Sequence, residues 1–113
     1  MAVKINDESV DGKKVLSLDG RIDTAASEPF LQKLTEIINE GCNLILIDFT
    51  DVAFISSSGL RVLLQANKKV RPYGGKILLC CLPKDVLEVF DISGFSSMFP
   101  ILASRQEGLE AMN

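Results

Sequence analysis

The chain has 113 residues, a length that fits one compact domain, and we expect a single domain over residues 1–113. Its net charge of -3 and the scattered placement of its lysines and arginines argue against direct nucleic-acid binding, which requires a basic surface. The sequence contains no histidine, so a Ser-His-Asp triad and a histidine zinc site are both excluded. We therefore expect neither a catalytic site nor a bound metal or cofactor.

The three cysteines indicate a reducing compartment. Cys42 stands alone, and Cys80 and Cys81 are adjacent inside an apolar run, which is a poor framework for disulfides and no C-x-x-C motif. We expect this pair to be buried in a strand. No secretory signal opens the chain, and no apolar stretch approaches the roughly 20 residues that cross a membrane. These observations predict a cytoplasmic protein without a membrane partner.

The apolar spacing along the chain predicts strands that alternate with helices. Asp11 and Gly12 form a strong turn signal between the first two strands, and Gly20 is predicted to end the second strand. In chain order, we expect strands at 2–10 and 14–19, a helix at 24–40, a strand at 43–49, a loop at 50–57, a helix at 58–71, a strand at 76–82, a helix opened by Pro83, a strand at 98–102 and a terminal helix.

The terminal helix and the element order complete the predicted fold. Ser104 and Glu107 form a capping-box pattern for a helix that would bury Leu109 and Met112. The order ββαβαβαβα requires a mostly parallel sheet with right-handed crossovers. We therefore predict the α/β class: a mixed, mostly parallel sheet with an antiparallel hairpin at its N-terminus and about four helices.

The carboxyl edge of this sheet is the expected place for a functional site, because ligands and partners of open α/β sheets meet that edge. Three segments are predicted to lie there, namely 20–24, 48–59 and 81–85. The middle segment contains three consecutive serines, Ser56, Ser57 and Ser58, at a junction between a loop and a helix.

Two interpretations of the serines stay open on the residues alone. One serine can cap the following helix, a role worth about 1 kcal/mol. The same position presents free N–H groups and the positive end of the helix dipole to an anion. A hydroxyl displayed there is accessible to a kinase, and its own helix would tolerate the phosphate.

Several stretches together resemble the STAS domains of bacterial anti-sigma factor antagonists. DVAFISSSGLRVLL, at 51–64, is similar to the family signature D-x-x-[FY]-x-[DS]-S-[SA]-G-L. GRID at 20–23, GGKILLC at 74–80 and VLEVFDISGF at 86–95 are similar to further family segments, so the resemblance covers nearly the whole chain.

The resemblance implies a binding protein that works by partner switching. The unphosphorylated antagonist binds an anti-sigma factor that is also a serine kinase, which frees a sigma factor. The kinase then phosphorylates the antagonist, and a serine phosphatase resets it. The resemblance places the phosphate on Ser57; the preceding residue is often Asp in the family and is Ser56 here, so Ser56 stays an alternative. It also implies partner-binding residues, which are Asp23, Thr24, Ser56, Ser58 and Gly59.

Two other classes of function remain as alternatives. One is a STAS accessory subunit of a transporter or a lipid-trafficking complex, which would bind protein without phosphorylation. The other is an enzyme or nucleotide-binding domain, which the sequence disfavours. Gly75 and Lys76 belong to no complete G-x-x-x-x-G-K-[ST] motif, and Ser57 lies in no G-x-S-x-G elbow. Phe54, a lone aromatic residue beside Ile55, is either an exposed contact anchor or tucked under its loop, and such a residue is more often tucked.

Overall fold

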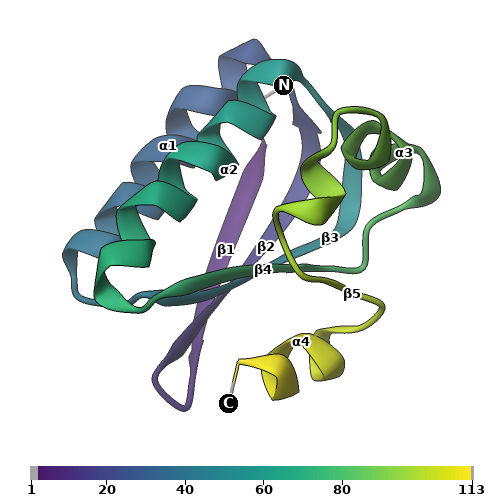
Figure 1. Cartoon of the computed structure of the whole chain (residues 1–113). Helices are drawn as coiled ribbons and strands as arrows, with labels where there is room; N and C mark the ends of the chain where they lie inside the picture. Colours follow the sequence, from purple (N-terminus) through teal and green to yellow (C-terminus); the bar gives the residue numbers. More distant parts are fainter. Residues whose placement is uncertain (1–2, 113) are drawn as a thin grey trace.

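The computed structural model describes residues 3–112 and shows one five-stranded mixed sheet with helices on both of its faces (Figure 1). The strands lie in the order β1-β2-β3-β4-β5; β1 and β2 are antiparallel, and the other neighbouring pairs are parallel. The elements are β1 (Lys4–Val10), β2 (Lys13–Ile22), α1 (Thr24–Asn39), β3 (Leu44–Ile55), α2 (Ser57–Val70), the 3-10 turn η1 (Arg71–Tyr73), β4 (Lys76–Cys80), α3 (Lys84–Ile92), the 3-10 turn η2 (Phe95–Ser97), β5 (Ile101–Leu102) and α4 (Arg105–Ala111).

This arrangement confirms the predicted α/β class, the element order and the hairpin. Asp11 and Gly12 both have positive φ, 50° and 80°, as a tight turn that matches the twist of the two strands requires. Ser104 caps α4 as expected, because its side chain accepts a hydrogen bond from the Glu107 N–H at 3.1 Å. Met112 is buried, and Leu109 is half-buried against the same cluster.

Two predicted boundaries at the sheet edge were wrong. β2 does not end at Gly20 but continues to Ile22, because Gly20, with φ of 118°, bends the strand without stopping it. The predicted loop at 50–57 is instead the second half of β3, which runs to Ile55 and pairs with β2. Register shifts interrupt this pairing, so buried and exposed residues do not alternate in this half of β3. The sequence therefore shows no regular strand pattern there.

Two boundaries near the C-terminal half also differ from the prediction. β4 ends at Cys80, because Cys81 adopts a left-handed φ of 62°. The predicted strand at 98–102 is reduced to Ile101–Leu102, because Met98 ends the turn η2 in a helical backbone conformation and only Ile101 and Leu102 pair with β4.

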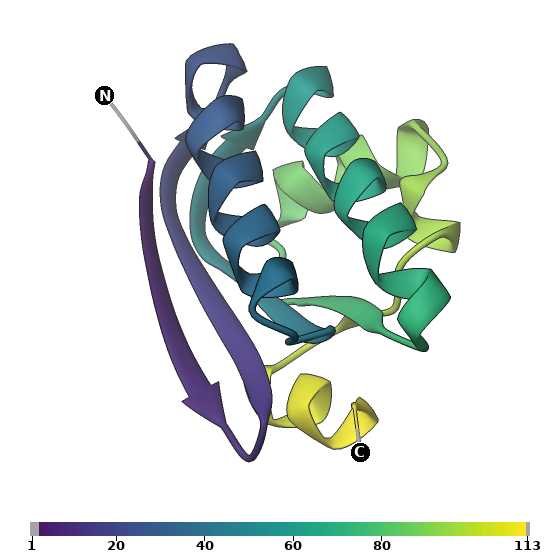
Figure 2. The same cartoon turned by 90° about the vertical axis from the view of Figure 1, so that its left-hand side faces the viewer.

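The helices divide the core into two parts. α1 and α2 run side by side across one face of the sheet, whereas α4 covers the lower part of the other face (Figure 2). The larger cluster lies under α1, α2 and α3 and includes the fully buried Phe30, Phe49 and Phe90. The smaller cluster packs Met112 against Val15, Leu46, Leu78 and Cys80. No helix within residues 3–112 is long and apolar enough to cross a membrane.

α4 is attached to the sheet by a polar network around Arg105. Its guanidinium donates to the Asp48 carboxylate on β3 at 3.1 Å, to the Ser17 hydroxyl on β2 at 2.7 Å and to the Glu8 carboxylate on β1 at 2.6 Å. Burial by itself would raise the pKa of the Asp48 carboxyl, but the hydrogen bonds from Thr50 and Arg105 outweigh it, and the pKa lies below its ordinary value of 3.8. One side chain of a short helix therefore connects three strands.

We predict that Arg105→Met destabilises the fold by about 1–3 kcal/mol at neutral pH, because Asp48 then keeps a nearly buried charge with fewer donors. The lowered pKa means that this contribution is present above pH 3.8 and is lost as the pH falls through the folded-state pKa. Urea unfolding at pH 7 and at about pH 3 checks this, and the difference from wild type should shrink at the lower pH. Arg71→Met, at an exposed arginine, is the control; an equal loss in both variants would contradict the role of the network.

Candidate functional site

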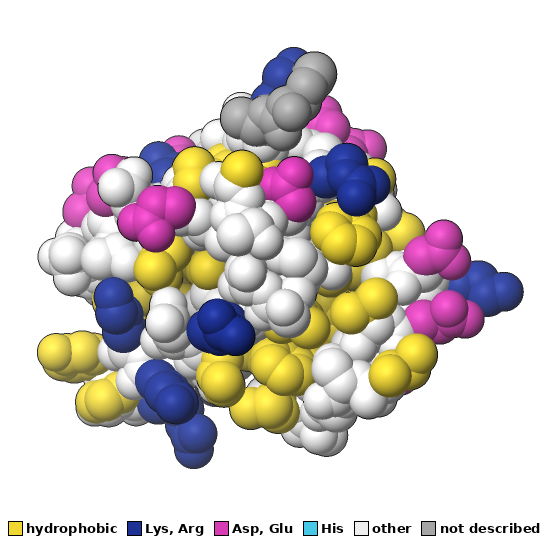
Figure 3. Space-filling view, turned by 90° about the horizontal axis from the view of Figure 1, so that it is seen from above, with side chains coloured by type: hydrophobic (Ala, Val, Ile, Leu, Met, Phe, Trp, Pro, Cys, Tyr) yellow, Lys and Arg dark blue, Asp and Glu magenta, His cyan; other side chains and the backbone are white. Residues whose placement is uncertain are grey.

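Two helix N-termini lie next to each other at one end of the molecule. Ile22 and Ile55 are paired at the ends of β2 and β3, and the Ser56 N–H donates to the Ile22 carbonyl at 2.8 Å. The next residues, Asp23 and Ser56, are the N-caps of α1 and α2. Figure 1 shows both helices starting at this end, and Figure 3 shows the same end from above, with apolar patches between scattered charges. Paired strand ends thus bring two of the predicted segments together.

The three serines have different environments. The Ser56 hydroxyl accepts a hydrogen bond from the Gly59 N–H at 3.2 Å and caps α2. Ser57 is the first residue of α2; it is exposed, and within residues 3–112 its hydroxyl has no hydrogen-bond partner. Ser58 is half-buried. Ser56 therefore provides the predicted cap, whereas Ser57 is displayed to solvent, and its phosphorylation stays a prediction.

Gly59 is buried, and its small size allows α2 to pack closely against the ends of β2 and β3. A Cβ atom at this position would lie 2.8 Å from Ile22 Cγ2 and 2.8 Å from Ile55 Cγ1. The first turn of α2 can therefore sit directly on the ends of β2 and β3 only if this residue has no side chain. Gly59 presents no contact surface in this structure, and its predicted part in partner binding stays a prediction.

Asp23 has a structural role as the N-cap of α1. Its carboxylate accepts a hydrogen bond from the Ala26 N–H at 3.0 Å, and its backbone carbonyl accepts from the Ser27 hydroxyl at 2.9 Å. The side chain of Asp23 is half-buried, and Thr24 is exposed beside it. Contact of Asp23 and Thr24 with a partner stays a prediction, and Asp23→Ala should cost about 1 kcal/mol of folding stability through the lost cap.

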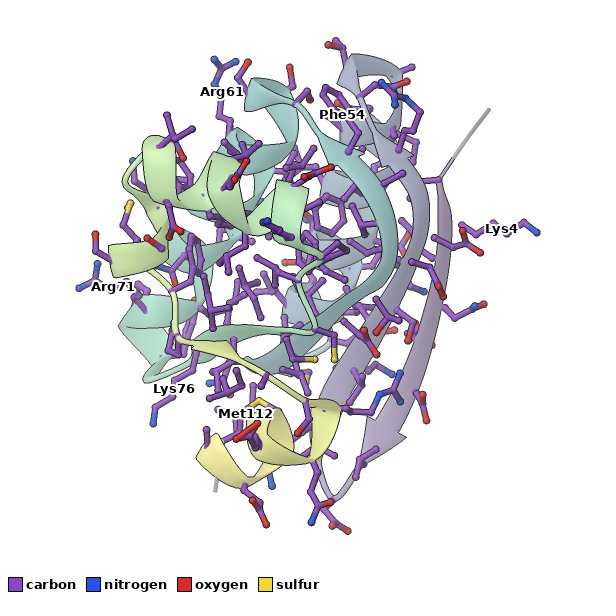
Figure 4. All side chains as sticks on the ribbon, turned by 90° about the vertical axis from the view of Figure 1, so that its right-hand side faces the viewer. Lys4, Phe54, Arg61, Arg71, Lys76 and Met112 are labelled. Atoms are coloured by element: carbon purple, nitrogen blue, oxygen red, sulfur yellow. The ribbon has the colours of Figure 1, made fainter. Side chains whose placement is uncertain are left out.

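The expectation that Phe54 is tucked away was wrong. Because β3 continues to Ile55, Phe54 lies on an ordered strand, and 36% of it is exposed. The Arg21 guanidinium of β2 lies over its ring, 4.4 Å from the centroid, so a cation and an aromatic face are held together near the two helix N-termini. Figure 4 places Phe54 at the same end of the molecule as Arg61. The sequence reasoning missed this pair because Arg21 and Phe54 meet only through the β2–β3 register.

The third predicted segment does not join the other two. β4 ends at Cys80, which is paired with Asp48, whereas β3 continues beyond that level to Ile55. Residues 81–85 therefore leave the sheet well before the helix N-termini are reached. The structure places the candidate site on β2, β3, α1 and α2.

Asp48, Cys80 and Cys81 are the one group of potential metal ligands among the described residues, with ligand atoms within 4.8 Å of one another. Both carboxylate oxygens of Asp48 already accept hydrogen bonds, one from Thr50 and the other from Arg105. Burial, with the neighbouring thiol and carboxylate, raises the pKa of Cys80, which disfavours the thiolate that a metal needs. The chemistry of this cluster fits a structural role.

Comparison with known proteins agrees with this geometry. Residues 4–108 match the family model of the STAS domain. A Bordetella bronchiseptica protein named as an anti-sigma factor antagonist, BtrV, is 35% identical over 109 residues, which cover 96% of this chain and 94% of that protein. The anti-sigma-B factor antagonist of Bacillus subtilis is 28% identical over 108 residues, with 96% and 94% covered.

Solved structures share the fold. SpoIIAA, an anti-sigma factor antagonist, has a TM-score of 0.75 at 22% identity in its unphosphorylated form, with 96% of each chain covered. The phosphorylated form of the Bacillus protein has a TM-score of 0.77 at 23% identity, covering 97% of this chain and 100% of that chain. The fold and the match to the family model identify a STAS domain. Within that class, the chain belongs to the anti-sigma factor antagonist family.

We predict that Ser56 and Ser57 differ in their effect on stability. Ser56→Ala removes the side-chain acceptor of the Gly59 N–H and should cost about 1 kcal/mol of the free energy of unfolding. Ser57→Ala should change the free energy of unfolding by less than about 0.5 kcal/mol, because it removes only an exposed hydroxyl that has no hydrogen-bond partner among residues 3–112. Urea denaturation of the two variants beside wild type checks this, and the pair are matched controls for each other. A larger loss in Ser57→Ala than in Ser56→Ala would show that the cap is assigned to the wrong residue.

Proposed function

We propose that this protein is a phosphorylation-controlled anti-sigma factor antagonist. In this proposal, the unphosphorylated form binds an anti-sigma factor that is also a serine kinase, which releases a sigma factor. Phosphate on Ser57 ends the binding, and a serine phosphatase restores it. The protein has no enzymatic activity of its own in this cycle. The observation that carries the proposal is the exposed Ser57 hydroxyl at the start of α2, which has no hydrogen-bond partner in the described part of the chain and lies next to Ser56, which already serves as the cap.

The position of Ser57 supports a phosphate that leaves the fold intact. At the first residue of a helix, a phosphate meets free N–H groups and the positive end of the dipole, an interaction worth about 0.3–1 kcal/mol. Arg61 follows four residues later and is exposed, so helical spacing puts its guanidinium on the same side of α2. A phosphorylated SpoIIAA with this fold is consistent with the idea.

The surroundings of Ser57 support loss of binding after phosphorylation. Exposed Phe54, with Arg21 over its ring, offers an aromatic anchor of the kind that dominates protein interfaces. A partner that covers Phe54 and an unmodified Ser57 would have to accommodate a group of about -1.5 to -2 charge after phosphorylation. The desolvation of that charge, together with its volume, would weaken the complex.

We predict that Ser57→Ala binds an anti-sigma kinase about as tightly as wild type, whereas Ser57→Asp binds at least tenfold more weakly, equivalent to about 1.4 kcal/mol. Both should melt close to wild type, because Ser57 is exposed and its hydroxyl has no hydrogen-bond partner among residues 3–112. Isothermal titration against a candidate anti-sigma kinase from the same organism measures the affinities.

Gln106→Asp is the matched control, because it adds the same charge to the first turn of another helix, α4, at an exposed residue. Its affinity should equal that of wild type. Equal binding by Ser57→Asp and Ser57→Ala would contradict the proposed switch, as would equal weakening by Gln106→Asp.

A further inference from the structure

β1 is a free edge of the sheet. It is the outermost strand on its side, it pairs only with β2, and no other strand within residues 3–112 lies along it (Figure 2). Five of its seven residues are exposed, and the other two, Ile5 and Val10, are half-buried. The backbone along this edge is therefore accessible over about 23 Å, a length that can pair with another extended segment.

The hairpin decides which peptide groups of β1 point outward. The two-residue turn after β1 makes its last residue, Val10, a hydrogen-bonded pair with Lys13 of β2. In an antiparallel ladder, such pairs recur at every second residue. The intervening residues Ile5, Asp7 and Ser9 therefore direct their N–H and C=O groups away from β2, toward the open edge.

A second copy of β1 matches this edge when the two copies are related by a two-fold axis at Asn6. Antiparallel pairing about Asn6 sets the outward-facing Ile5 opposite the outward-facing Asp7 of the second copy, so the backbone groups can bond. The same register sets Lys4 opposite Glu8 of the second copy and, by symmetry, Glu8 opposite Lys4. Directly opposed side chains of opposite charge stabilise a strand pair.

The neighbouring two-fold registers lack this charge match. A register centred on Asp7 or on Glu8 sets that carboxylate opposite its own copy, which is repulsive. A register centred on Ile5 sets Lys4 opposite Asn6 and forms no pair of opposite charges. Among these four registers, the one centred on Asn6 is the self-complementary one.

Both charges are available for the contact. Lys4 is exposed and makes no ion pair within residues 3–112, although Asp19 is its register partner on β2. Figure 4 shows the Lys4 side chain pointing away from the sheet. Glu8 uses Oε1 to accept from Arg105, and 53% of its side chain is exposed. Its other carboxylate oxygen can therefore accept from a lysine of a second copy.

We propose that this protein forms a two-fold dimer through β1, which joins two five-stranded sheets into one continuous sheet. A single strand edge buries a small area, so we expect a weak dimer with a Kd on the order of 100 µM. α1 lies between β1 and α2, so Ser57 stays exposed in both copies (Figure 2). The dimer would present two Ser57 sites to a partner.

Sedimentation velocity of the full chain from about 10 µM to 1 mM tests the dimer, and the average mass should rise toward that of a dimer. Lys4→Glu sets two carboxylates opposite each other at both ends of the interface and should weaken association by about tenfold or more. Lys4→Arg keeps the charge and should associate like wild type. Lys84→Glu is the matched control, because it makes the same charge change at an exposed residue of α3.

Hydrogen exchange of the ¹⁵N-labelled chain locates the interface. Exchange of the Ile5 and Asp7 amides should slow by about fivefold between 10 µM and 1 mM, because the dimer bonds them. The Asn6 amide, which faces β2, should change less. Three results would overturn the proposal: a monomer at 1 mM, equal weakening by Lys84→Glu and Lys4→Glu, or a dimer in which exchange at Ile5 and Asp7 is unchanged.

Discussion

The parallel pairing of β2 with β3, carried as far as Ile22 and Ile55, is the constraint on which the rest of the site depends. It fixes where both strands end, so the N-caps of α1 and α2 follow at adjacent positions. Gly59 then allows the first turn of α2 to rest on both isoleucines. Ser57 is exposed as a consequence of this packing, because Ser56 before it caps α2 and Gly59 after it is buried against the strand ends.

The structure separates a packed frame from the surface that carries Ser57. The Arg105 network attaches α4 to three strands far from the serines, and the apolar clusters hold α1, α2 and α3. A charge added at Ser57 therefore meets solvent and a helix N-terminus without disturbing a buried contact. In the proposed switch, the affinity for the partner would therefore change while the fold stays the same.

Much of the fold could be predicted from the sequence because its signals are local. The Asp11-Gly12 turn, the Ser104 cap and the alternation of strands with helices each depend on a few neighbouring residues. The second half of β3 could not be predicted, because register shifts against β2 hide its pattern. For the same reason, the sequence favoured a tucked Phe54 over the exposed one that the structure shows. The serine run drew attention to the candidate site, but only the structure separates the cap at Ser56 from the exposed Ser57.

The most direct measurement of the central claim is the position of the phosphate. Wild type, Ser56→Ala and Ser57→Ala are incubated with the anti-sigma kinase, and tandem mass spectrometry assigns the modified residue. The account predicts phosphate on Ser57 in wild type and in Ser56→Ala, and none in Ser57→Ala. Phosphate on Ser56 in wild type, or undiminished labelling of Ser57→Ala, would contradict it.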